Sequence, residues 1–127
     1  MMQKLDSNTV IEQAQGVAGL ECFDSDSFRD GLDIFLSDFN NSGAPEAAIE
    51  RLRGNVVQVL ANRLKVTSYL DQRPELLKRP IERPVFVFGI PRTGTTLLSN
   101  LLAADPVRRS PLTWEIDDPV PPATSKT

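Results

Sequence analysis

The stretch PVFVFGIPRTGTTLLSNLLAA, residues 84–104, decides the fold. Residues 85–88 form a continuous apolar run between a proline and a glycine. Because polar and apolar residues do not alternate there, the run predicts a short strand buried on both faces, as in a parallel sheet. Four leucines at helical spacing follow, and Asp105-Pro106 stops the pattern. The stretch therefore predicts a strand at residues 85–88, then a loop, then a helix over roughly residues 94–104.

The loop between the predicted strand and helix has the residues of a phosphate site. A helix N-terminus presents unpaired N–H groups and a partial positive charge. Gly89 and Gly94 let the backbone approach a ligand closely. Arg92 adds a permanent charge with a forked set of donors, and the threonines at 93, 95 and 96 add hydroxyl groups. We therefore predict an anion site wrapped by residues 89–94.

Two other interpretations of this loop stay open. Gly89 and Gly94 are spaced as in the Walker A motif, which would indicate a P-loop nucleotide-binding protein. Thr95 stands where that motif has its lysine, so a nucleotide triphosphatase would lose its main β/γ-phosphate contact. The alternative without a ligand is a plain strand–turn–helix, and the joint presence of Pro91, Arg92 and the Gly-Thr-Thr run argues against it.

The sequence PRTGTTLL, residues 91–98, resembles the 5′-phosphosulfate loop of sulfotransferases that use 3′-phosphoadenosine 5′-phosphosulfate (PAPS). It is similar to the bacterial branch with Pro-Arg-Ser/Thr-Gly-Thr-Thr. The segments LAADP at 102–106, PLTWEI at 111–116 and DPVPP at 118–122 also match that branch. The resemblance implies an α/β, P-loop-like sulfotransferase fold. This chain would hold its N-terminal helical region and its first strand–loop–helix unit.

The resemblance also implies a role for each loop residue. Arg92 resembles the catalytic cation that contacts the phosphosulfate and stabilises the leaving phosphate. The residues that resemble the donor-binding loop are Pro91, Arg92, Thr93, Gly94, Thr95 and Thr96. The implied reaction transfers a sulfuryl group from PAPS, the co-substrate, to an acceptor hydroxyl or amine. Such a transfer needs positioning and charge stabilisation and does not require a metal. The sequence does not identify the acceptor.

The region before the loop predicts three helices. Apolar residues at helical spacing place them over residues 8–20, 26–39 and 45–71. Thr9 and Glu12 have the spacing of a capping box for the first helix. An acidic or serine side chain within residues 24–26 would cap the second.

The positions of the prolines and the changes in composition along the chain predict four regions. They are a helical N-terminal region at 1–73, a connector at 74–83 with a single helical turn near 75–78, the start of the P-loop-like domain at 84–118, and a disordered tail at 119–127. Trp114 and Glu115 would lie on a second short strand, either near an acceptor pocket or as a core residue and a strand-end charge.

Composition excludes several classes of chemistry. The chain has no histidine, which excludes Ser–His–Asp and Cys–His catalysis within it. Cys22 is the only cysteine, so an internal disulfide is impossible, and no residue spacing indicates a metal site. The net charge of −3 argues against nonspecific nucleic-acid binding, although residues 73–109 carry 7 basic and 3 acidic side chains. No signal peptide or membrane span is expected, and we expect a cytoplasmic protein.

The prediction is thus the N-terminal part of a sulfotransferase. The 3′-phosphate site and the catalytic base of the family have no counterpart here, so we expect the 127-residue chain alone to be inactive. The open edges of its strand would favour self-association. The alternative is a non-catalytic helical interaction module with a vestigial anion-binding loop, or a P-loop nucleotide-binding protein that lacks the Walker lysine.

Overall fold

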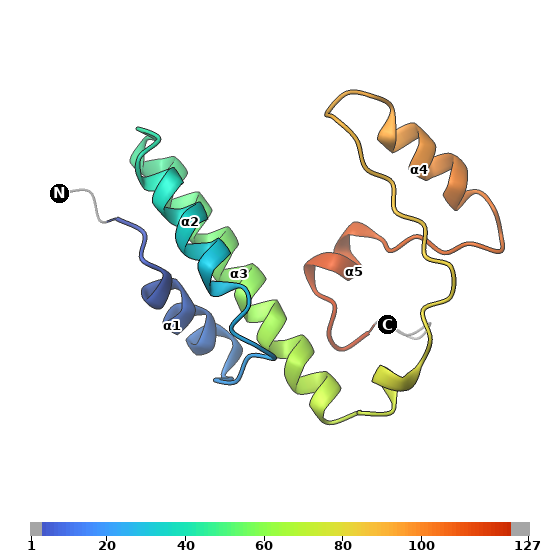
Figure 1. Ribbon diagram of the computed structural model, residues 1–127, viewed down its shortest axis with the longest axis horizontal. Coiled ribbons are helices and arrows are strands. Elements are labelled where there is room, and N and C mark those ends of the chain that lie inside the picture. The colour runs from blue at the N-terminus through green and yellow to red at the C-terminus, as the bar shows by residue number, and fades with distance from the viewer. Residues whose placement is uncertain (1–3, 123–127) are drawn as a thin grey trace.

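Three helices form the packed part of the molecule. The computed structural model describes residues 4–122, and its first helices are α1 (Ser7–Ala18), α2 (Arg29–Asn40) and α3 (Glu46–Asp71). The first helix, α1, packs along α3 and also contacts α2, and the three helices form one group in Figure 1. The predicted helices over 8–20, 26–39 and 45–71 are therefore confirmed to within three residues at their ends.

The hydrophobic core lies entirely in this helical region. Within residues 4–122, the nine buried apolar residues belong to one cluster: Leu5, Val10, Ile11, Ala14, Leu36, Ile49, Leu60, Ala61 and Leu64. Asn40 fastens the chain ahead of α1 to the end of α2. Its side chain donates to the carbonyl of Leu5 at 2.8 Å and accepts from the Leu5 N–H at 2.9 Å. The bundle is a self-contained support for the segment that follows it.

The caps of the first two helices differ from the prediction. The α1 N-cap is Asp6, whose carboxylate accepts from the backbone N–H of Thr9 at 2.9 Å. The expected Thr9–Glu12 capping box is wrong because the helix starts earlier and Thr9 is already its third residue. No side chain caps α2, because the helix begins at Arg29 and its N-cap residue is Phe28. Among the expected caps, Asp24 accepts from the guanidinium of Arg63 on α3 at 2.7 and 2.9 Å.

The chain leaves the bundle at the end of α3 and passes through one short turn. The 3-10 helix η1 (Leu76–Lys78) occupies the predicted single turn of the connector. From there an extended segment leads to α4 (Thr95–Ala103), which confirms the helix predicted after the glycine-rich loop. The chain then returns toward α3 through α5 (Thr113–Asp117), as Figure 1 shows.

The predicted strand at residues 85–88 is not formed. Residues 4–122 contain helices and no strand, and the side chains of Phe86 and Phe88 are 80% and 90% exposed rather than buried. A strand requires a neighbour that pairs with its N–H and C=O groups, and no described residue pairs with this segment. The α/β class of the predicted fold is therefore not realised in this part of the chain.

The second predicted strand, at Trp114 and Glu115, is wrong because these residues lie in α5. The cause is local. The Glu115 carboxylate accepts from the backbone N–H of Leu112 at 2.7 Å, as an N3 glutamate does at a helix start. The same carboxylate forms an ion pair with Arg109. Together these two contacts fix a short helix where a strand was predicted.

The remaining expectations concern the ends of the chain and its chemistry. Residues 119–122 contain no helix or strand, and the rest of the predicted disordered tail, 123–127, lies outside the described residues. Cys22 is exposed and free. In the described range no helix has both the length and the apolar composition needed to cross a membrane. Over the same range no group of three or more potential ligands is placed to hold a metal ion.

Candidate donor-phosphate loop

The loop ahead of α4 is a tight turn with two residues in the left-handed region of backbone space. Arg92 has φ 70° and Gly94 has φ 90°. Glycine adopts this conformation without strain, whereas a residue with a Cβ is held there at a cost of about 1–2 kcal/mol. The unusual backbone at Arg92 therefore indicates a position that the surrounding loop determines rather than one that the residue prefers.

A side chain of the loop closes the turn. The hydroxyl of Thr93 donates to the carbonyl of Ile90 at 2.6 Å. A Cβ placed on Gly89 would lie 3.0 Å from the Thr93 hydroxyl oxygen and 3.1 Å from the methyl carbon of Thr95. Glycine is thus needed at position 89 because two threonine side chains converge over it. Since the hydroxyl proton of Thr93 is engaged with Ile90, this hydroxyl holds the turn closed and does not donate to a ligand in this conformation.

The N-terminus of α4 follows this turn directly. The first hydrogen bond of the helix runs from the Leu98 N–H to the carbonyl of Gly94 at 3.0 Å. The amides before Leu98 have no partner within the helix, and no side chain caps them. Such amides, at the positive end of the helix dipole, form the kind of place where anions bind. The loop and the helix start therefore provide backbone donors at one end of α4.

The predicted catalytic cation, Arg92, is exposed at the tip of this turn. No ion pair of the described residues engages it, whereas Arg108 pairs with Asp105 at 3.4 Å and Arg109 with Glu115. Of these arginines near the loop, Arg92 alone is available to a ligand without first losing a carboxylate partner. The structure brings residues 91–96 together at one turn, and their assignment to donor binding stays a prediction.

The contacts of α5 were not predicted from the sequence. The side chain of Asn62 on α3 donates to the carbonyl of Asp117 at 2.6 Å, and Lys65 pairs with Asp118 at 3.7 Å. Both contacts join residues more than fifty positions apart, so no local pattern could have indicated them. They anchor the end of the loop-bearing segment to the middle of α3.

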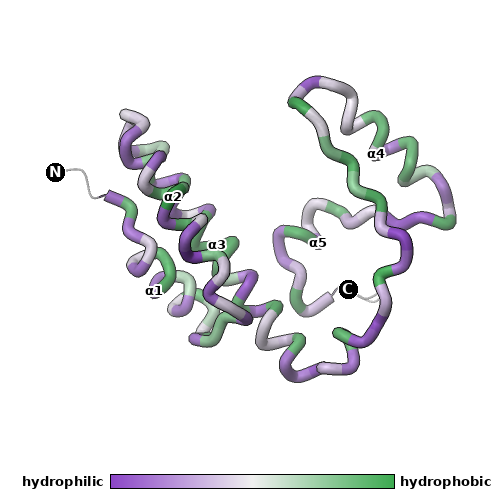
Figure 2. The backbone as a smooth tube through the Cα atoms, viewed as in Figure 1, coloured by the Kyte–Doolittle hydropathy of each residue, from purple (hydrophilic) through white to green (hydrophobic). Residues whose placement is uncertain are grey.

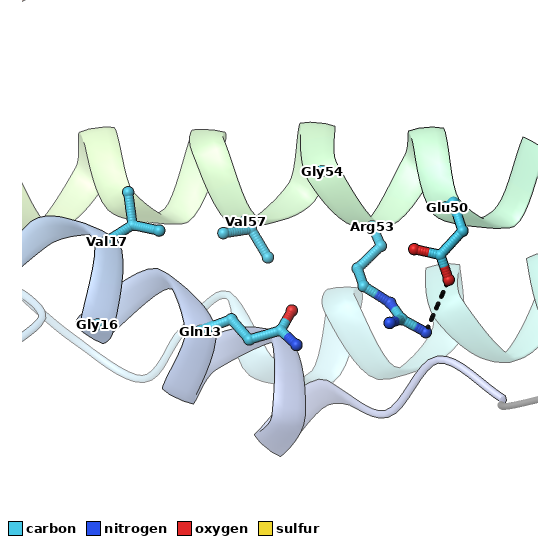
Figure 3. Close-up of a pocket in the computed structure, with 7 residues that line it drawn as sticks. All are labelled: Gln13, Gly16, Val17, Glu50, Arg53, Gly54 and Val57. Atoms are coloured by element: carbon cyan, nitrogen blue, oxygen red, sulfur yellow. Dashed lines mark ion pairs between the residues drawn. The ribbon is translucent and has the colours of Figure 1, made fainter.

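A groove elsewhere on the molecule is unrelated to this loop. It lies between α1 and α3 and has a volume of about 470 Å³ (Figure 3). Its lining residues are Gln13, Gly16, Val17, Glu50, Arg53, Gly54 and Val57. Arg53 pairs with Glu50 along α3 at 3.3 Å, so the cation of the groove is neutralised from within its own helix. The groove thus lacks the unpaired cation and free amides that distinguish the loop before α4.

Comparison with known proteins relates the chain to one family. Residues 84–126 match the sulfotransferase family. Two solved structures resemble the chain, both sulfotransferases. The one from Mycobacterium avium has 40% identity and a TM-score of 0.84 over 94% of this chain. The one from Mycobacterium tuberculosis has 30% identity and a TM-score of 0.85, also over 94%. No curated protein sequence matches.

These comparisons confirm the family resemblance that the sequence predicted. The matched residues 84–126 include the whole loop, and the structural likeness extends to the helical region before it. The chain spans 31% and 33% of the length of the two sulfotransferases. Activity, donor and acceptor therefore belong to the proposals below.

Proposed function

We propose that this chain, whose residues 84–126 match the sulfotransferase family, supplies the donor-binding part of a PAPS-dependent sulfotransferase. Residues 91–96 and the first amides of α4 hold the 5′-phosphate of the donor. Arg92 contacts the phosphosulfate. Because the chain spans about a third of its solved relatives, catalysis is expected of a whole protein and not of these 127 residues.

The reaction assigns one electrostatic task to this segment. An acceptor oxygen or nitrogen attacks the sulfur of the donor, and the bond between sulfur and the bridging phosphate oxygen breaks. The electron pair of that bond stays on the 5′-phosphate, where negative charge develops. In this proposal Arg92 and the unpaired amides at the start of α4 stabilise this charge. The acceptor loses its proton to a base that we do not assign to any residue of this chain.

One observation carries the proposal. An arginine that pairs with no carboxylate of residues 4–122 stands in a left-handed turn directly before an uncapped helix N-terminus, inside the segment that matches the family. Neither the charge nor the helix end alone would indicate a donor site. Their combination provides a permanent cation and backbone N–H groups within four residues, as an anionic phosphosulfate requires.

The test is binding of adenosine 3′,5′-bisphosphate, the donor without its sulfuryl group, to the purified chain. We expect weak binding that Arg92→Ala reduces roughly 10- to 150-fold, as the loss of a charge-assisted hydrogen bond of about 1.5–3 kcal/mol predicts. Arg92→Lys should retain part of the affinity because it keeps the charge but not the fork. Arg79→Ala is the matched control, since it removes one exposed positive charge outside the loop.

Other results would point to the other interpretations. If the chain binds no bisphosphate, or if Arg79→Ala weakens binding as much as Arg92→Ala does, the donor site is refuted. The helical interaction module with a vestigial loop is then the better description. Preference for magnesium–ATP over the bisphosphate would indicate a P-loop nucleotide-binding protein instead. The cytoplasmic location stays a prediction.

A further inference from the structure

The turn before α4 holds one residue in a conformation that it does not favour. Figure 2 shows this turn as a short, less hydrophobic break between two hydrophobic stretches. Arg92 has φ 70° there, and it forms no hydrogen bond or ion pair with other residues of the range 4–122. The ring of Pro91 fixes the φ of the preceding residue, so the turn can relax only at its other residues. The left-handed backbone of Arg92 is therefore held by contacts that its neighbours make.

Three residues around Arg92 make these contacts. The hydroxyl of Thr93 donates to the carbonyl of Ile90 at 2.6 Å and so joins the two sides of the turn. A Cβ on Gly89 would lie 3.0 Å from the same hydroxyl oxygen and 3.1 Å from the methyl carbon of Thr95. The two threonine side chains thus occupy the space that a larger residue at position 89 would take. We call Gly89, Thr93 and Thr95 the loop lock.

Gly89 differs in this respect from the other six glycines of the chain. A Cβ on any of those six would meet no atom within 4 Å. Gly94 is needed for its φ of 90°, whereas Gly89 is not among the residues with a positive φ, so the need at position 89 is steric. Thr95 is also the first residue of α4. The loop lock therefore joins the residue before the turn, the turn itself and the start of the helix.

We propose that Gly89 and Thr93 are positioning residues for Arg92. The loop lock keeps Arg92 in the left-handed region, and the hydroxyl of Thr93 serves the loop rather than the ligand. The consequence for binding rests on the proposed function, because it needs an anionic donor at Arg92 and the first amides of α4. The lock itself does not, since its contacts form without a ligand. An incoming anion then meets a cation and amides that are already in place, and less ordering opposes its binding.

A direct role for the Thr93 hydroxyl as a ligand would have a different signature. As a ligand, the hydroxyl could be removed without a change in the backbone of Arg92 before the donor is added. As part of the loop lock, its removal changes that backbone in the free chain. The conformation of residue 92 without ligand therefore distinguishes the two roles.

The experiment measures φ at residue 92 by NMR in the 127-residue chain, first alone and then with adenosine 3′,5′-bisphosphate. A positive φ brings the amide proton and the Hα of one residue close together, so a strong cross-peak between them reports the left-handed conformer. In Thr93→Val the equilibrium constant for this conformer should fall roughly 2- to 12-fold, as expected for the loss of one hydrogen bond. The affinity for the bisphosphate should fall with the left-handed population. Thr93→Ser keeps the hydroxyl and should restore both.

Replacement of Gly89 tests the steric half of the loop lock. The Cβ added by Gly89→Ala should push the Thr93 hydroxyl away from Ile90 and weaken the same cross-peak. Thr95→Ser in the same chain removes the methyl carbon that lies 3.1 Å from this Cβ and should restore part of the signal. Gly16→Ala on α1 is the matched control, because its Cβ meets nothing within 4 Å. Circular dichroism checks that each variant keeps its helices.

Two outcomes would overturn the proposal. If the cross-peak of residue 92 is unchanged in Thr93→Val, the lock does not hold Arg92, and any loss of affinity then marks the hydroxyl as a ligand. If the cross-peak weakens while the affinity stays the same, the conformation of Arg92 does not matter for binding. If the unmodified chain binds no bisphosphate, the proposed function fails, and the spectra without ligand still decide whether the lock holds Arg92.

Discussion

Replacing Thr93 with valine tests whether the donor loop is held closed by its own side chain. The hydroxyl of Thr93 donates to the carbonyl of Ile90 at 2.6 Å, across the turn that contains Arg92 at φ 70°. Valine keeps the branched shape of threonine and removes the hydrogen bond. Without that bond, less opposes the relaxation of Arg92 out of the left-handed region, so the loop should spend less time in its binding conformation.

The size of the effect follows from the single bond that is lost. A hydrogen bond of this kind contributes about 0.5–1.5 kcal/mol net, because the freed carbonyl of an exposed loop can bind water. If the full amount opposes ligand binding, the affinity for adenosine 3′,5′-bisphosphate falls roughly 2- to 12-fold. The loss should be smaller than that for Arg92→Ala, since Thr93 acts here through the conformation of the loop.

The assay is an NMR titration of the chain with adenosine 3′,5′-bisphosphate. It follows the amide signals of Gly94, Thr95 and Thr96. Thr93→Ser is the control because it keeps the hydroxyl, and its affinity should stay within about twofold of the unmodified chain. The reasoning is refuted if the valine variant binds as tightly as the unmodified chain. It is equally refuted if the serine variant loses as much affinity as the valine variant.

Two further predictions concern the helical region. Leu64→Ala, at a side chain with no exposed surface, should lower the free energy of unfolding by about 2–5 kcal/mol. Leu77→Ala, at an exposed side chain, should change the free energy of unfolding by less than about 0.5 kcal/mol. If urea denaturation shows the same loss of stability for both variants, the assignment of Leu64 to the hydrophobic core is wrong. The hydrogen bond from Arg63 lowers the pKa of Asp24 in the folded protein. The pair therefore stabilises the fold at pH values above the pKa that Asp24 has in the unfolded chain. This contribution is lost as pH falls below about 4. Asp24→Asn should therefore reduce thermal stability at pH 7 and have a smaller effect at pH 3; an equal effect at both would exclude an ionic role.

The helices were predictable because their signals are local. In α1 the spacing of Val10, Ile11 and Ala14 reports one face of the helix, and these same residues became core. Caps were less predictable, because a carboxylate near a helix start can find a distant partner. From the sequence, Asp24 is one of the candidates to cap α2. In the structure Asp24 accepts a hydrogen bond from Arg63, which is 39 positions away. The guanidinium of Arg63 also lies over the ring of Phe28.

The loop residues could be identified from sequence because their pattern is contiguous. Gly89 and Gly94 bracket the turn, and a different geometric need explains each of them. Gly94 has a positive φ, and Gly89 lies under the Thr93 and Thr95 side chains. What the pattern could not reveal is the left-handed backbone of Arg92, since arginine has no preference for that region. It also could not reveal that the Thr93 hydroxyl binds within the loop.

The failed strand prediction and the exposure of Phe86 and Phe88 have one physical origin. A continuous apolar run predicts burial on both faces, but a sequence pattern does not say which polypeptide provides the cover. For Val10 or Leu36 the cover comes from helices close in sequence, and those residues are buried. For Phe86 and Phe88 none of the described residues provides it, so the same apolar character leaves them exposed and their backbone unpaired. The discrepancy between predicted burial and observed exposure therefore arises from the lack of cover within residues 4–122 and not from the local apolar pattern.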